Sequence, residues 1–278
     1  MIAIWVKKLQ SSKAVSSAVS AVIMTGTLVV LISVALVFAN NFFSVRMAES
    51  EFNSARQFMQ TVGLQIDDVA WVIGRTETVR YSSRYGSVSF ESALNYTIYI
   101  NTTTQLNRKL CTTTTGILCF NMPVSRYSIG NNYYELIYPS SNEGLLLKGA
   151  SAPVARVLAL EKLPMGDGSF VRVVVAPAIR MLNLTIGDTR YIRLYLPVLL
   201  EGEAPKLSQS ITLTGETVSK LGESVTGIKV EVRFPLSSGG FDNYFFHFSK
   251  TTETIPLSGK TVVELYVGGV DVALGVHP

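Results

Sequence analysis

Residues 14–45 read AVSSAVSAVIMTGTLVVLISVALVFANNFFSV, and this stretch decides the fold. It contains no Lys, Arg, Asp, Glu or His. As an α-helix it would be about 48 Å long, which exceeds the ~30 Å hydrocarbon core of a bilayer. The stretch therefore predicts a helix that spans a membrane.

The residues before this stretch set the expected orientation. Residues 1–13 contain Lys7, Lys8 and Lys13 and no acidic residue. Basic residues next to a span stay in the cytoplasm, so the rest of the chain is expected outside. A cleaved secretory signal is the alternative, but its apolar core is shorter and ends in a small-residue cleavage site. Since neither feature is present, the sequence favours a retained helix.

A second helical pattern follows the span without a break. Apolar residues recur at steps of three and four, which is the spacing of one helical face. We therefore predict one helix over residues 16–73, with Gly63 as a weak point and Gly74 as the C-cap. The apolar stripe must be buried against the chain's own C-terminal domain, against neighbouring copies, or both. The stripe consists of Phe52, Ala55, Met59, Val62, Ile66, Val69 and Ile73.

From residue 75 the pattern changes to alternating apolar and polar residues, with Gly, Pro, Asn, Asp and Ser between the runs. Many short Val-, Ile-, Tyr- and Phe-rich runs of this kind predict an antiparallel β-sandwich or open barrel. The fold class is thus α+β, a long N-terminal helix followed by a mainly antiparallel β-sandwich-like domain. Residues 152–163 fit either a short helix or a strand, and residues 201–209 fit a linker, although one continuous domain is simpler. The predicted segments are a basic leader at 1–14, a transmembrane helix at 15–45, an amphipathic extension at 46–74 and an extracytoplasmic β-rich domain at 75–278.

The composition offers little for catalysis. The net charge is +4 over 278 residues, and there is no basic run or nucleic-acid motif, so no nucleic-acid partner is expected. With two histidines and no nucleophile, zinc-protease, P-loop or dinucleotide motif, we expect no enzyme, cofactor or metal site. Asp67 and Asp68 are interpreted as a solvated helix face, or as partners of an arginine such as Arg75, Arg80 or Arg84. The run 166–168 (Gly-Asp-Gly) is read as a turn rather than part of a calcium loop.

Several polar and aromatic residues carry further hypotheses. Cys111 and Cys119 are either a disulfide pair or two unrelated thiols. Three N-x-[ST] sequons, at Asn95, Asn101 and Asn183, are either N-glycosylation sites or incidental. Seven tyrosines are either half-buried packing or an adhesive surface, and packing is favoured; they are Tyr81, Tyr85, Tyr96, Tyr99, Tyr133, Tyr134 and Tyr138.

The junction at Lys13-Ala14-Val15 is the most specific signal in the chain. With the short basic leader before it and the apolar helix after it, it resembles the class III signal peptide of archaeal type IV pilins and related surface filament proteins. The resemblance implies cleavage between Ala14 and Val15 by the membrane-embedded prepilin peptidase. Many archaeal pilins have proline at the third mature position, where this chain has Ser17. Bacterial pilins usually carry glutamate at the fifth, where this chain has Val19, which argues against a bacterial member.

Two functions follow as hypotheses. The resemblance implies a structural subunit, or an associated minor component, of an archaeal type IV pilus-like filament, stored in the membrane and assembling with other pilin-like subunits through its helix. The alternative is a single-pass membrane protein whose β domain binds a ligand or an envelope component and never polymerises. The resemblance covers residues 7–73 only, so it implies nothing about the β domain.

Overall fold

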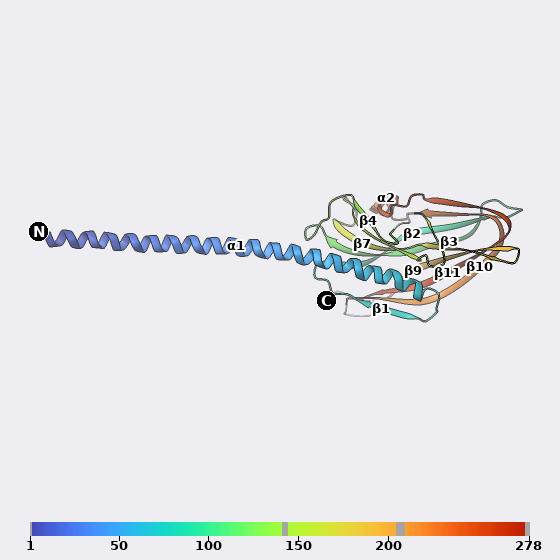
Figure 1. The fold of residues 1–278 in the computed structure, drawn as a ribbon, viewed down its shortest axis with the longest axis horizontal. Coiled ribbons are helices and arrows are strands. Elements are labelled where there is room, and N and C mark those ends of the chain that lie inside the picture. Colours follow the sequence, from blue (N-terminus) through green and yellow to red (C-terminus); the bar gives the residue numbers. More distant parts are fainter. Residues whose placement is uncertain (1, 141–143, 204–208, 276–278) are drawn as a thin grey trace. The chain divides into compact units, whose positions relative to one another are not determined.

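The computed structural model describes residues 2–140, 144–203 and 209–275, and side chains from residue 19 onward except 258–260. Its contacts divide the chain into two compact units, residues 1–48 and residues 49–278. We describe the two units separately and call the second one the head. Helix α1 (Ile2–Val69) supplies all of the described part of the first unit and the opening segment of the head (Figure 1).

The head is built mainly from strands. Within the residues that the structure describes, the chain after α1 forms one sheet, one 3-10 turn and one short helix (Figure 1). The elements are β1 (Thr76–Arg80), β2 (Ser87–Asn101), β3 (Arg108–Pro123), β4 (Tyr133–Tyr138), β5 (Leu146–Lys148), β6 (Ala155–Glu161), β7 (Phe170–Pro177), β8 (Ile179–Ile186), β9 (Thr189–Glu201), β10 (Ser210–Arg233), η1 (Ser237–Gly239), α2 (Asn243–Phe246) and β11 (Thr252–Leu274).

The sheet runs in the order β4-β6-β7-β3-β2-β10-β11-β9-β8-β5, and β1 pairs with β10 outside this path. All described pairings are antiparallel except β9 with β11 and β5 with β8. The predicted α+β class with a mainly antiparallel β domain is therefore confirmed. Residues 152–163 contain a strand, β6, and not a helix. β9 and β10 belong to the same sheet, so the head is one unit on both sides of the predicted linker at 201–209, of which residues 204–208 lie outside the described residues.

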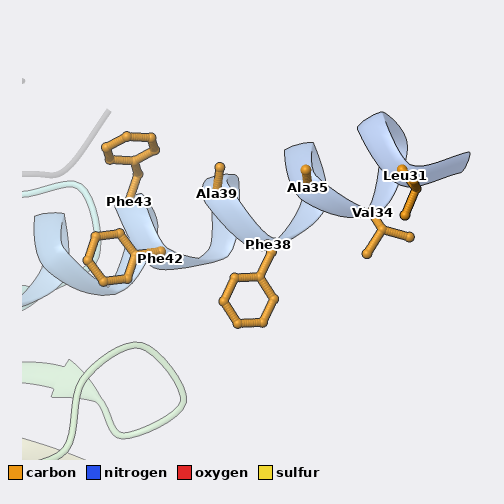
Figure 2. Close-up of a pocket in the computed structure, with 7 residues that line it drawn as sticks. All are labelled: Leu31, Val34, Ala35, Phe38, Ala39, Phe42 and Phe43. Atoms are coloured by element: carbon orange, nitrogen blue, oxygen red, sulfur yellow. The ribbon is translucent and has the colours of Figure 1, made fainter. Parts of the chain in front are cut away.

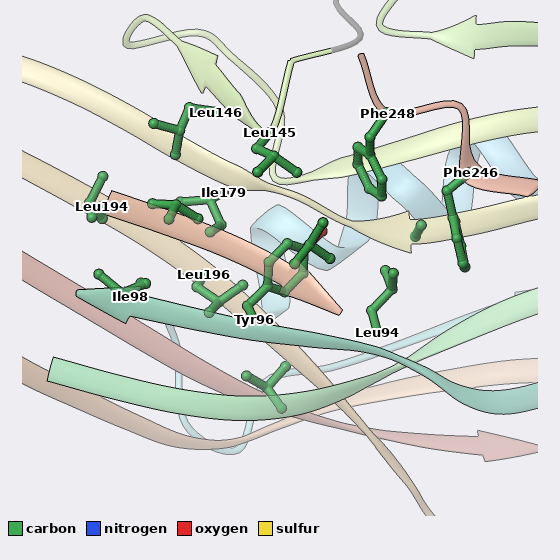
Figure 3. Packing of buried hydrophobic residues seen from close by; sticks show 14 of the residues in the cluster. Leu94, Tyr96, Ile98, Leu145, Leu146, Ile179, Leu194, Leu196, Phe246 and Phe248 are labelled. Carbon is green, nitrogen blue, oxygen red and sulfur yellow. The ribbon is translucent and has the colours of Figure 1, made fainter. Parts of the chain in front are cut away.

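The sheet folds back on itself around one apolar core. The core takes Leu94 and Tyr96 from β2, Leu194 and Leu196 from β9, and Ile179 from β8, all of them buried (Figure 3). Strands β3 and β9, which are not neighbours in the order of the sheet, are joined by a hydrogen bond from the Leu199 amide to the Thr115 hydroxyl at 2.9 Å. The strands thus form the sandwich-like arrangement that the alternating pattern predicts.

The head segment of α1 packs on the outer side of this sheet. The predicted stripe from Phe52 to Val69 is at most 2% exposed at every position. Gly63 faces Val157 and Val175, where an added Cβ would lie 3.0 Å and 3.7 Å from their methyl groups. The stripe is therefore covered by the chain's own C-terminal domain, one of the two partners that the sequence allows.

The helix ends earlier than the sequence predicts. It stops at Val69 instead of residue 73, and Ile73 is exposed. Gly74 has the positive φ (79°) expected of a cap, and its amide donates to the Gly215 carbonyl at 2.7 Å. In return the Gly215 amide donates to Arg75. The turns of residues 70–74 replace the last helical turn because the backbone there is joined to β10.

Of the two readings of Cys111 and Cys119, the disulfide pair is contradicted. Cys111 and Cys119 are free thiols in the same strand, β3. Eight residues of strand separate their Cα atoms by about 26 Å, whereas a disulfide requires less than 7 Å. The Cys119 side chain is buried in the apolar core, and burial raises the pKa of its thiol to about 12. It is a core side chain, in agreement with the reading of two unrelated thiols.

Candidate membrane span and head anchor

The first unit exposes a continuous apolar surface. From Val19 to Val45 the large side chains of α1 are between about half and three quarters exposed, with Phe38 at 77%. Figure 2 shows one face of this segment, where Leu31, Val34, Phe38 and Phe42 project from successive turns. A soluble protein rarely leaves so large an apolar surface in water. The helix is long and apolar enough to cross a membrane, which indicates membrane association.

Three hydroxyl groups in the middle of this segment are satisfied inside the helix. Thr25, Thr27 and Ser33 each donate to the carbonyl four residues earlier, at 2.8 Å. Since hydrocarbon offers no hydrogen-bond partner, such internal bonds remove the main cost of placing these residues in lipid. Gly26 has no atom within 4 Å of an added Cβ, so the helix surface is open there.

The predicted processing site lies in the backbone of α1. Residues 13–15 are helical, and their side chains fall outside those described. Cleavage between Ala14 and Val15 therefore stays a prediction, as do the leader at 1–14 and the prepilin peptidase as a partner.

Glu51 fastens the head segment of α1 to the loop before β2. Its carboxylate accepts hydrogen bonds from the hydroxyl of Ser83 and from the amides of Arg84, Tyr85 and Gly86, the three amides at 3.0 Å. Burial alone would raise the pKa of Glu51, but these hydrogen bonds outweigh it and lower the pKa below its ordinary value. The side chain thus acts as an ionised clamp on the loop.

Asp67 makes a second polar link between helix and sheet. It accepts from the Arg180 guanidinium of β8 at 2.7 Å and from the Trp71 indole at 2.8 Å. The Asp68 carboxylate lies 4.0 Å from the Arg75 guanidinium, and the two side chains are 65% and 43% exposed. The sequence allowed an arginine partner for this acidic pair, and the structure provides Arg180 as well as Arg75, one of the three named.

The Gly-Asp-Gly run at 166–168 has a structural role. Asp167 pairs at 2.6 Å with Arg172, whose side chain is 1% exposed. The Arg172 guanidinium also lies over the rings of Phe170 and Phe241. Asp167 is therefore the counter-ion of a buried arginine. Within the described residues, no group of three His, Cys, Asp or Glu side chains could hold a metal ion.

The tyrosines do not gather into one surface. Tyr96 is buried, and its hydroxyl donates to the Pro177 carbonyl at 2.9 Å. Tyr134 stacks on His247 with the ring centroids 3.8 Å apart. Tyr81 stacks on Phe58 at 4.9 Å. Of the seven tyrosines named from the sequence, only Tyr133 is exposed, at 38%, and the other six are buried or half-buried. The packing interpretation is confirmed.

The three sequons differ in their surroundings. Asn183 is exposed on β8, near the turn to β9, and its side-chain oxygen accepts from Arg190 at 2.9 Å. Asn95 and Asn101 are half-buried on β2. The side-chain amide of Asn95 donates to the Thr114 hydroxyl, and the side-chain oxygen of Asn101 accepts from the backbone amide of Asn107. N-glycosylation at these positions stays a prediction.

Two contacts of the anchor could not be found from the sequence. Glu51 looks like any exposed acid on an amphipathic helix, and its partners lie more than thirty residues away. Arg180 follows β7 with no local signal that it faces Asp67.

No family model matches this chain, and comparisons with curated proteins and with solved structures found no match.

Proposed function

We propose that this protein is a pilin-like subunit, or an associated minor component, of an archaeal type IV pilus-like surface filament. The observation that carries the proposal is the Lys13-Ala14-Val15 junction directly before an uncharged helix. A prepilin peptidase cuts at such a junction, on the cytoplasmic side of the membrane. In this proposal the lysines hold the N-terminus in the cytoplasm and the head lies outside.

The exposed helix supports storage in the membrane followed by assembly. Before assembly, lipid covers the apolar side chains around Phe38. In a filament, the same segment of neighbouring copies replaces the lipid. Small residues such as Ala21, Gly26 and Ala35 let helices approach closely. The head keeps its own stripe covered, so assembly through the first unit leaves the head intact.

A second function is compatible with the structure because the head buries the apolar stripe of α1 without needing a neighbouring copy. In this alternative the chain is a single-pass membrane protein with an extracytoplasmic binding domain that never polymerises. The two functions make opposite predictions for the mature N-terminus.

The test is the intact mass and N-terminal sequence of the chain purified from an archaeal host with a prepilin peptidase. A mature chain that begins at Val15 supports the pilin-like function. Ala14→Asp places a charge at the cut and should leave the leader attached and abolish surface filaments. Ala3→Asp adds the same charge far from the cut and should be processed normally. A wild-type chain that retains residues 1–13 contradicts the proposal and favours the non-polymerising anchor.

A further inference from the structure

A polar groove crosses one end of the head, between the loop that follows β2 and the middle of β10. Its volume is about 590 Å³. The groove is lined by Thr102, Thr104, Gln105, Arg108, Gly222, Glu223 and Ser224. None of these residues belongs to α1 or to the anchor, so the groove is independent of the function proposed above.

The loop that forms one wall is held by its own hydrogen bonds. The Thr102 amide donates to the Gln105 carbonyl at 2.9 Å, and the Gln105 amide donates to the Thr102 hydroxyl at 3.0 Å. The Asn107 amide donates to Asn101 at 2.8 Å, where Asn107 takes a positive φ. The wall is therefore ordered before any ligand arrives, which lowers the entropic cost of binding.

The lining of the groove includes a glycine that the fold does not require. A Cβ built on Gly222 meets only the Val263 carbonyl, at 3.9 Å, and the residue has no positive φ. At Gly215 and Gly268, by contrast, an added Cβ lies within 2.5 Å of a backbone carbonyl of α1 or the turn after it. A glycine inside a strand with free space above it marks a place where another molecule can approach the backbone.

The chemistry of the lining selects a class of ligand. Arg108 and Glu223 pair at 2.7 Å, so the formal charges of the lining cancel. Three hydroxyls and one carboxamide add donors and acceptors beside this pair. Adjacent planar groups of this kind can hold two neighbouring hydroxyls of a sugar ring. Neutral charge disfavours nucleic acid, and the scarcity of apolar lining disfavours lipids and apolar peptides.

From the ordered wall, the open glycine in the lining and the neutral donor-acceptor groups, we propose that this groove binds a neutral carbohydrate. Vicinal hydroxyls of the sugar bond to Arg108 and Glu223, beside the exposed backbone of Gly222. Without an aromatic ring in the lining, a single site binds weakly, with a Kd on the order of 1 mM. Several copies presented together on one surface would raise the apparent affinity.

The test uses the full chain in detergent micelles and saturation-transfer NMR with neutral oligosaccharides ending in mannose, glucose, galactose or N-acetylglucosamine. We expect at least one of them to bind. Gly222→Leu adds a bulky side chain to the lining and should weaken binding at least tenfold while the melting temperature of the head stays within about 2 °C. The matched control is Ser219→Leu, which adds the same side chain at an exposed position of β10 outside the groove and should bind as wild type.

A second variant keeps the test decisive if Gly222→Leu fails to fold. Arg108→Gln with Glu223→Gln removes both charges together, preserves neutrality and should also weaken binding at least tenfold. The proposal is overturned if none of the oligosaccharides binds wild type at 10 mM. It is equally overturned if a folded Gly222→Leu or the double variant binds as tightly as wild type.

Discussion

At the scale of single residues, Glu51 joins the head segment of α1 to a loop more than thirty residues away. Its lowered pKa means that the folded state favours the carboxylate. This contribution to stability is present above the ordinary pKa of about 4.5 and is lost as the pH falls through the lower, folded-state pKa. The clamp is therefore sensitive to acid, although the carboxylate is partly exposed and its contribution is reduced by solvent.

We predict that Glu51→Gln lowers the free energy of unfolding by about 1 kcal/mol at pH 7, because a charge-assisted acceptor becomes a neutral amide. The deficit relative to wild type should shrink as the pH falls below 4.5 and through the lowered folded-state pKa, where the wild-type carboxylate takes up a proton. Denaturant unfolding of the full chain in detergent at pH 7 and pH 3 measures both values. Glu49→Gln, at a half-buried position two residues earlier in α1, is the comparison. A deficit that is the same at both pH values would contradict the clamp.

Two glycines with opposite surroundings give a second prediction at this scale. A Cβ at Gly268 would lie 2.2 Å from the Ala70 carbonyl and 3.0 Å from the Trp71 ring. Since backbone cannot move aside cheaply, Gly268→Ala should destabilise the head by about 3 kcal/mol or more. Gly222→Ala, in open space on the neighbouring strand, should change stability by less than about 0.5 kcal/mol. Melting curves of the two variants measure the contrast, and equal losses would show that the close approach is not rigid.

At the scale of elements, α1 carries two different surfaces in one helix. The segment from Val19 to Val45 is exposed, whereas the stripe from Phe52 to Val69 is buried in the head. The periodicity of the sequence predicts both, because an all-round apolar helix and a one-sided apolar helix have different patterns. It misses the end of α1 because the turns after Val69 are fixed by β10 and β11, which lie far away in the sequence.

The buried stripe predicts that α1 is part of the head and not only its tether. Val62 is fully buried against the sheet, so Val62→Asp would place an unpaired charge in the core. We expect a loss of several kcal/mol, enough to unfold the head, seen as lost near-UV circular dichroism and rapid proteolysis. Thr61→Asp, on the exposed side of the same turn, should leave both signals unchanged. A protease-resistant Val62→Asp head would mean that the strands fold without the helix.

At the scale of the whole molecule, the sequence predicts the class of fold but not its topology. Alternation in the runs after residue 75 is a local signal, and it correctly predicts strands. The order of the strands depends on pairings such as β2 with β10 and β9 with β11, for which no local signal exists. The same holds for the polar groove, whose walls come from residues 102–108 and 222–224. The sequence also left open a disulfide between Cys111 and Cys119. That reading is contradicted for a related reason, because both cysteines lie along one extended strand.

The pairing of β2 also has a consequence for the time course of folding. β2 pairs along most of its length with β3, which follows it directly, but residues 95–101 also pair with residues 227–233 of β10. More than a hundred residues must be synthesised between the two partners, which takes about 10 s at typical rates of translation. During that interval one edge of β2 lacks its partner, and such edges promote aggregation. The head is thus a domain of high contact order that completes its sheet only after β10 has emerged, so a chaperone that holds the unfinished chain would raise its yield.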